Sequence, residues 1–356
     1  MASLPLSVLD LCPVPDGEST GETLRRSVDL ARHVERWGFT RYWVAEHHNL
    51  PGIASAAPAV LIGQLTAATS TIRVGSGGVM LPNHAPLTVA EQFGTLESLH
   101  PGRIDLGIGR APGTDPVTAR ALRRSAAGLP TAGFADQLAE LRGYFADPRD
   151  TAGGTAGDAP KIRAIPAEGN EPAVWLLGST GFSAELAGLL GLPFAFAYHI
   201  TTANARPALA LYRRVFRPSA ALAEPYCLVS VPVLCAPDAA SAHWRHGSMR
   251  LSALRQRAGR PSTLPSPEHS AERSYSAAEQ SVIAEATGSH IVGDPATVSR
   301  LLTELAASLG ADEVMVTTST FAHADRLDSF GLLAQAADLG EQHGSFSAVG
   351  RLRGSS

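Results

Sequence analysis

The residues Gly75-Ser76-Gly77-Gly78-Val79-Met80-Leu81-Pro82-Asn83-His84 close an extended segment and lead into a turn rich in glycine, proline and histidine. The alternation of Ile72-Arg73-Val74 before them is typical of a strand. Glycine enters a strand where the backbone bends, bulges or lets a ligand approach closely, and a bulge is the commoner reason for a pair. The stretch therefore predicts a strand whose end forms either a bulge or a ligand platform.

Strand-like and helix-like segments alternate on both sides of this stretch. Short apolar runs favour strands, whereas apolar residues spaced three and four apart favour helices. The predicted strands span residues 6–11, 39–44, 72–81, 103–110, 173–177, 193–200, 226–234 and 313–317. The predicted helices span 19–37, 56–70, 86–99, 179–190, 205–216, 239–258, 295–309 and 327–337, and the first opens with Ser19 and Glu22 at the spacing of a capping box.

This alternation predicts an α/β fold of the (β/α)8 TIM-barrel type, because parallel neighbouring strands need a crossover helix between them. A doubly wound open sheet is the alternative. We expect one domain over residues 1–343, with a polar insertion at about 260–289 before the last strand. Residues 344–356 are expected to be a disordered tail, and the segment rich in Gly, Ala, Asp and Pro at about 146–170 is expected to be a surface excursion.

The composition favours a small ligand over a nucleic acid or a membrane. Of the 356 residues 44% are hydrophobic and 17% charged, and the formal net charge is −4. No run of lysine and arginine offers a basic patch, no stretch reaches membrane-spanning length, and the first residues lack the pattern of a signal peptide. We expect a cytoplasmic protein that binds a small neutral or anionic molecule.

Residues with useful chemistry gather where the predicted strands end. In a parallel barrel the binding and catalytic loops lie at the carboxyl ends of the strands. We predict a site at that end, and we assign the substrate pocket to Asp10, Cys12, Glu46, His84 and His199.

An anion site is predicted after the fourth and fifth strands. The run Gly178-Ser179-Thr180-Gly181-Phe182-Ser183 joins a strand to a helix, and free backbone N–H groups at a helix start can hold a phosphate. Arg110 adds a permanent charge that can bind a phosphate through two hydrogen bonds. The alternatives are a simple helix cap and an ion pair of Arg110 with Asp105 or Asp115.

His47 is the candidate acid or base, because imidazole titrates near neutral pH. Glu46, His47 and His48 are also the residue types of a metal site, but adjacent residues on a regular strand point to opposite faces. We expect His48 to be held by a hydrogen bond within the loop.

Several of these segments together resemble the bacterial luciferase-like, flavin-dependent monooxygenases. The resemblance is carried by residues 42–48, 75–86, 90–92, 101–103, 107–110 and 177–179, in register from residue 6 to about 340. It implies a TIM barrel that binds FMN at its carboxyl end. The implied reaction uses reduced FMN from a separate NAD(P)H-dependent flavin reductase, captures O2 as a flavin hydroperoxide and inserts one oxygen atom into a small organic substrate.

The resemblance also implies roles for particular residues. His47 matches the catalytic histidine, which protonates or stabilises the peroxyflavin. Gly77-Gly78 matches a cis peptide bond beneath the flavin ring, and the phosphate-binding positions match Arg110, Gly178, Ser179, Thr180 and Ser183. The insertion matches a mobile lid.

The resemblance leaves alternatives open. Some members modify natural products, and a homodimer is usual for the family. The light-emitting luciferase subunit has a cysteine beside the phosphate arginine where this chain has Gly109, which argues against luminescent aldehyde oxidation. The other functions considered are hydride transfer with a deazaflavin, a metal-dependent barrel hydrolase, and a flavin-binding subunit without catalysis.

Overall fold

Eight parallel strands close into a barrel. The computed structural model describes residues 4–111, 115–123, 133–147 and 162–341. Each barrel strand pairs with its neighbours in parallel; β6 closes on β7, β7 pairs with β9, and β9 returns to β1. The barrel strands are β1 (Leu6–Asp10), β2 (Arg41–Val44), β3 (Arg73–Met80), β4 (Ile104–Gly109), β5 (Ala173–Gly178), β6 (Phe194–Phe196), β7 (Cys227–Cys235) and β9 (Glu313–Thr317). The predicted (β/α)8 barrel is confirmed, and the open sheet is excluded.

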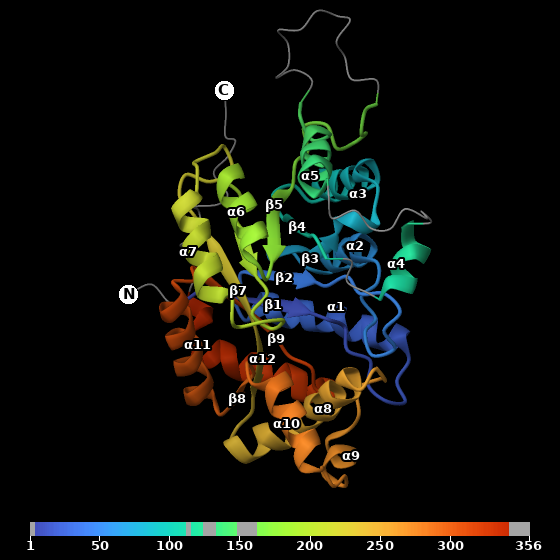
Figure 1. The fold of residues 1–356 in the computed structure, drawn as a ribbon, viewed down its shortest axis with the longest axis vertical. Coiled ribbons are helices and arrows are strands. Elements are labelled where there is room, and N and C mark those ends of the chain that lie inside the picture. Colours follow the sequence, from blue (N-terminus) through green and yellow to red (C-terminus); the bar gives the residue numbers. More distant parts are fainter. Residues whose placement is uncertain (1–3, 112–114, 124–132, 148–161, 342–356) are drawn as a thin grey trace, which may run out of the picture.

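Helices lie outside the strands, as Figure 1 shows. They are α1 (Thr20–Arg36), α2 (Pro58–Ala68), α3 (Pro86–Leu99), α4 (Pro116–Arg123), α5 (Phe134–Gly143), α6 (Gly181–Leu190), α7 (Ala205–Val215), α8 (Ala239–Arg257), α9 (Pro267–Ala271), α10 (Ala277–Thr287), α11 (Pro295–Leu309) and α12 (His323–Ala336), with short 3-10 turns η1 (Leu81–Asn83) and η2 (Leu339–Glu341). The Ser19 hydroxyl caps α1 by accepting a bond from the Glu22 backbone at 3.1 Å, whereas the Glu22 carboxylate bonds Arg25, so half of the predicted capping box is formed.

The insertion before the last barrel strand is more structured than the sequence suggests. It contains α9 and α10 and leads to a ninth strand, β8 (Ile291–Gly293), which pairs with the end of β7. Figure 1 shows α8, α9 and α10 gathered at one end of the view. Leu264 exchanges backbone hydrogen bonds of 2.7 and 2.9 Å with Val14 and Asp16, so this insertion is tied to the loop that follows β1.

Two other predictions concern segments that are only partly described. The tail 344–356 and residues 148–161 of the expected surface excursion lie outside the described residues. In the described end of that excursion, residues 162–170, most side chains are exposed or half-buried, and Ala164 and Ala167 are fully buried. Strand β6 is also shorter than the predicted 193–200, since the chain turns after Phe196 toward the site.

Charged side chains fill the amino-terminal end of the barrel interior. Arg41 donates to Glu313 at 2.8 Å and to Asp105 at 2.7 Å, and Asp105 also accepts from the Trp43 indole at 2.8 Å. All four side chains are almost fully buried. Burial alone would lower the pKa of Arg41 and raise that of Asp105, but the opposite charges hold each group in its charged form. This cluster closes the barrel floor.

An apolar layer lies between that floor and the opposite end of the barrel. It consists of inward-facing side chains from several strands, among them Leu9, Trp43, Trp175, Leu228 and Met315. Trp43 and Trp175 meet edge to face with ring centroids 5.2 Å apart, and Arg41 lies 4.6 Å from the Trp175 ring. The floor and the apolar layer therefore support each other.

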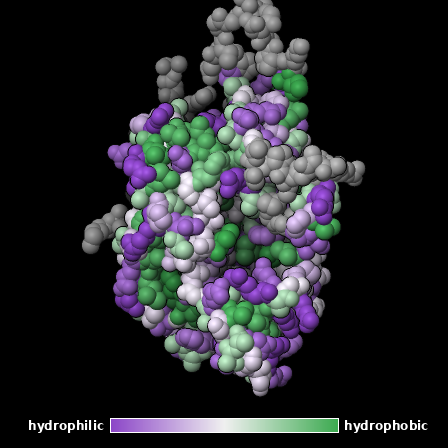
Figure 2. Space-filling view, in the orientation of Figure 1, coloured by the Kyte–Doolittle hydropathy of each residue, from purple (hydrophilic) through white to green (hydrophobic). Residues whose placement is uncertain are grey.

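In the described part of the chain, no helix combines the length and the apolar character that crossing a membrane requires. Figure 2 shows polar and apolar patches interspersed on one face of the molecule, with a hollow near its centre.

Replacing Arg41 by alanine should destabilise the protein strongly, because it leaves Glu313 and Asp105 buried with less compensation. We expect a loss of about 3–5 kcal/mol in the free energy of unfolding, measured by urea denaturation. The control is Arg300→Ala, which breaks an exposed pair with Glu304. Equal urea midpoints for the two variants would contradict the role given to the buried cluster.

Candidate active site

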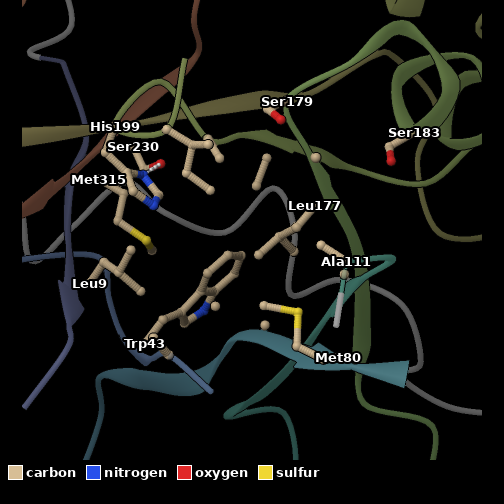
Figure 3. Close-up of a pocket in the computed structure, with 18 of the residues that line it drawn as sticks. Leu9, Trp43, Met80, Ala111, Leu177, Ser179, Ser183, His199, Ser230 and Met315 are labelled. Carbon is tan, nitrogen blue, oxygen red and sulfur yellow. Dashed lines mark hydrogen bonds between the residues drawn. The ribbon is translucent and has the colours of Figure 1, made fainter. Parts of the chain in front are cut away.

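A cavity opens at the carboxyl ends of the barrel strands, above the apolar layer. It is lined by residues from all eight barrel strands and the loops after them: Leu9, Leu11, Trp43, Ala45, His47, Gly77, Gly78, Met80, Gly109, Arg110, Ala111, Leu177, Gly178, Ser179, Thr180, Ser183, Ala195, Ala197, His199, Ile200, Leu228, Ser230 and Met315. Figure 3 shows Trp43, Leu9 and Leu177 pointing into it, with His199 and Ser230 on one side and Ser179 and Ser183 on the other. The cavity is mostly apolar with a few polar groups at its edges, as small-molecule sites usually are.

The two glycines of β3 form a bare wall of this cavity. The Gly77–Gly78 peptide bond is cis, as the family resemblance implies. A Cβ added at Gly77 would lie 2.7 Å from a Leu9 methyl, and one at Gly78 would lie 2.7 Å from the Gly107 carbonyl oxygen. Larger residues do not fit without displacing their neighbours, so the backbone itself faces the ligand here.

Positive charge and free helix donors meet at one edge of the cavity. Helix α6 starts after Thr180, whose side chain makes no capping bond to the first turn. The Arg110 guanidinium carbon lies 4.4 Å from the centre of the Phe182 ring in that turn. A cation beside the positive end of a helix dipole is unfavourable without an anion between them. The arrangement has the charge and the backbone donors that could hold an anion.

Arg110 does not form the ion pair with Asp105 or Asp115 that the sequence left open. Asp105 bonds Arg41 and Arg73, and Asp115 accepts from the amides of Val117 and Thr118. Ser183 is buried, and its hydroxyl occupies the space that a Cβ at Gly178 would need, 2.5 Å away. This contact explains the glycine at the start of the anion site.

His47 faces the cavity from the loop after β2. Its Nδ1 is buried and has no hydrogen-bond partner among the described residues. Burial lowers the pKa of His47 below its ordinary value, although the nearby Glu46 partly opposes this. The imidazole is therefore neutral at pH 7, and buried polar atoms without a partner often serve a ligand or a reaction.

Glu46 fixes the position of that loop from behind the cavity wall. Its carboxylate accepts from His84 Nε2 at 2.7 Å, from His48 Nε2 at 2.9 Å and from the Met80 amide at 3.1 Å. Burial would raise the pKa of Glu46, but these hydrogen bonds hold it below its ordinary value. Glu46 and His84, expected in the pocket, instead join the ends of β2 and β3. His48 makes the loop contact that the sequence indicates.

Asp10 and Cys12 also lie outside the cavity lining. Asp10 faces outward, where Arg326 of α12 and the Tyr42 hydroxyl each bind it at 2.5 Å, and it accepts from the Cys12 amide at 2.6 Å. Cys12 is fully buried against Ser27. Because side chains alternate along a strand, the outward direction of Asp10 sends Leu9 and Leu11 into the cavity instead.

Sequence reasoning missed most of the apolar lining. Trp43, Met80, Leu177, Leu228 and Met315 read as ordinary core residues, because strands covered on both faces show continuous apolar runs without alternation. Ser230 was missed because it lies inside a strand and not after one. The parity of the inward positions is the signal that could have found Leu11, which lies two residues after Leu9 of β1.

Among the described residues, no group of three or more His, Cys, Asp or Glu side chains is arranged to hold a metal ion. The fold and the site thus define a (β/α)8 barrel whose cavity has an arginine beside a helix start at one edge and a neutral histidine in its lining.

Comparison with known proteins gives the family. The description of luciferase-like monooxygenases matches residues 5–313, so the chain belongs to this family and is an oxidoreductase of the monooxygenase class. It is 50% identical to the uncharacterized protein YvbT of Bacillus subtilis over 92% of this chain and 95% of that protein. It is 46% identical to a luciferase-like monooxygenase of Escherichia coli K12 over 93% and 96%. The crystal structure of apo-MsnO8 superposes with a TM-score of 0.83 at 36% identity, covering 94% of this chain and 99% of that one.

Asp10 should stabilise the protein in a pH-dependent way without taking part in ligand binding. Burial would raise its pKa, but Arg326 and Tyr42 lower it below 3.8. Its contribution is therefore fully present above about pH 3.8 and is lost as the pH falls through the lower pKa of the folded state. Asp10→Asn should cost about 3–5 kcal/mol at pH 7 and flatten the acid limb of the stability curve, measured by urea unfolding.

The companion variant is Arg326→Met. The double variant should lose less free energy of unfolding than the sum of the losses in the two single variants. Each single variant leaves one buried charge without its partner, whereas the double variant leaves none. Strict additivity would show that the pair does not act as a unit.

Proposed function

We propose that the protein is a two-component, FMN-dependent monooxygenase that oxygenates a small organic substrate. The observation that carries the proposal is the position of Arg110 over the uncapped start of α6, at the edge of a cavity that also holds Gly77-Gly78 and His47. A phosphate supplies the anion that this edge needs, and the bare glycine wall leaves room for a flat ring.

The described residues fit FMN. Arg110, the first-turn amides of α6 and the hydroxyls of Ser179 and Thr180 would hold the phosphate. The apolar side chains of Trp43 and Leu177 line the space where the ring would lie. When bound and reduced, the flavin supplies the electrons with which O2 is activated.

The chain's own residues would bind, shield and transfer a proton. The cavity walls contributed by Leu9, Leu177 and Met315 exclude water, which protects reactive groups from hydrolysis. The neutral His47 imidazole, whose buried Nδ1 has no partner among the described residues, would hold or give up a proton at the reacting centre. Glu46 keeps that loop in place through His48 and His84.

Named relatives support oxygenation of an organic molecule. The N-acetyl-S-alkylcysteine monooxygenase of Bacillus subtilis is 42% identical over 195 residues, which cover 55% of this chain and 57% of that protein. The same fold occurs in the oxygenating constituent of 3,6-diketocamphane monooxygenase in complex with FMN, with a TM-score of 0.65 at 16% identity.

A second candidate is hydride transfer with a deazaflavin. The fold is shared by an F420-dependent secondary alcohol dehydrogenase at a TM-score of 0.63 and 14% identity. The anion edge around Arg110 suits the phosphate of either cofactor. A separate flavin reductase and a homodimer remain predictions.

Replacing Arg110 should separate FMN from riboflavin, which lacks the phosphate. Loss of a charge-assisted contact is worth roughly 1.5–3 kcal/mol, so Arg110→Ala should weaken FMN binding by about 10- to 100-fold. Riboflavin affinity should change by less than about threefold, since no phosphate contact is lost. Titration of flavin fluorescence measures both, with Arg300→Ala as the surface control. Equal losses for the two flavins would remove the phosphate assignment.

Replacing His47 should impair the reaction and spare the cofactor. His47→Ala should leave the FMN dissociation constant within about threefold, because the phosphate contacts proposed for Arg110 and α6 remain. Product formation should fall by about 100-fold or more, the usual range for loss of an acid–base group. Stopped-flow absorbance with reduced FMN and O2 should show a faster return to oxidised flavin than in a His100→Ala control. Loss of FMN binding would make His47 structural.

A further inference from the structure

A second histidine, His199, lines the same cavity from the loop after β6. It follows β6, and its ring Nδ1 lies 2.7 Å from the hydroxyl of Ser230 on β7. Its backbone amide also donates to the Ser230 carbonyl at 3.0 Å. Figure 3 shows the ring in the cavity beside Ser230, close to Met315 and Leu9. Two strands therefore hold this imidazole in one orientation.

The partners of Ser230 decide which ring nitrogen carries the proton. The Ser230 hydroxyl lies 3.3 Å from the Phe196 carbonyl oxygen, which can only accept a hydrogen bond. We assign the single proton of this hydroxyl to the contact with Phe196. The hydroxyl then accepts from His199 Nδ1–H, and Nε2 keeps a free lone pair.

His199 stays neutral across the physiological range. Burial, with a smaller contribution from His47, lowers its pKa to about 4. No described residue donates to its Nε2, which lies in the cavity as an acceptor only.

The surroundings of this acceptor are apolar. Leu9, Leu228 and Met315 line the same part of the cavity, and Ile200 follows His199 in the chain. A ligand that fills this space without a donor leaves Nε2 desolvated and unpaired, which is costly in an apolar site. A ligand with one donor among apolar groups satisfies it.

We propose that His199 and Ser230 select a neutral, largely apolar substrate that carries a hydroxyl or N–H donor, which His199 Nε2 accepts. His199 contacts the substrate, and Ser230 is a positioning residue that fixes its tautomer. The proposal rests on the proposed function in one respect: the cofactor phosphate occupies the Arg110 edge and leaves the His199 side to the substrate.

The test compares two probes that differ by one donor, 2-naphthol and its methyl ether 2-methoxynaphthalene. Equilibrium dialysis measures the dissociation constant of each for the FMN-loaded protein at pH 7. We expect 2-naphthol to bind at least tenfold more tightly. Equal affinities, or no measurable binding of either probe, would overturn the proposal.

Three variants locate the effect. His199→Leu should reduce the ratio of the two affinities to about one, whereas His199→Gln, which keeps an acceptor, should retain most of it. Ser230→Ala should lower the ratio in part, because the tautomer is then less strictly fixed. An unchanged ratio in His199→Leu together with a tenfold loss of FMN affinity would instead assign Nε2 to the ring of the cofactor, and would refute the substrate role.

The outcome can be separated from the oxygenase proposal. Dialysis requires no turnover, so an inactive protein that still distinguishes the two naphthalenes would retain the His199 assignment. If FMN does not bind, the same comparison on the flavin-free protein tests His199 alone.

Discussion

The site depends on one buried interaction, the pairing of Arg41 with Glu313 and Asp105. It joins the first residue of β2 to the starts of β4 and β9 inside the barrel, with contacts of 2.7 and 2.8 Å. A buried ion pair of this kind adds little stability compared with an apolar filling, but it becomes costly when one partner is missing. The arrangement therefore fixes which strands meet at the floor and how they are aligned.

The bottom of the cavity is formed by the apolar layer that packs on this charged floor. Trp43 bonds Asp105 through its indole and also lines the cavity, so the same side chain belongs to the floor network and to the site. Above this layer the strands end at different residue types: glycines on β3, an arginine after β4, hydroxyls after β5 and a histidine after β6. The cavity therefore has the proposed anion edge and, on another side, the proposed acceptor at His199. Glu46 adds a clamp that holds the His47 loop against the end of β3.

Much of the barrel could be predicted from the sequence, because glycine and proline mark strand ends and helical spacing marks the crossovers. The structure of the insertion was harder to predict than that of the barrel. Only Ile283 of α10 is buried, so the helix has almost no apolar stripe, although Ser276 and Glu279 do form a capping box that signals its start. Strand β8 is three residues long, too short for any alternation. In the site, polar residues such as Asp10 were favoured for their chemistry, while the direction of each side chain depends on strand parity. Trp43 lies in the run Arg41–Val44, which is buried throughout. The direction of its side chain therefore could not be inferred from an alternation of apolar and polar residues.

The central claim is that this cavity uses reduced FMN with O2. The most direct measurement is to mix the protein anaerobically with reduced FMN, admit air, and record absorbance spectra over seconds. The account predicts a transient band that differs from both reduced and oxidised FMN and that decays more slowly than free reduced flavin oxidises. Immediate return to oxidised FMN, combined with tight binding of a reduced deazaflavin in the same titration, would contradict it and favour hydride transfer.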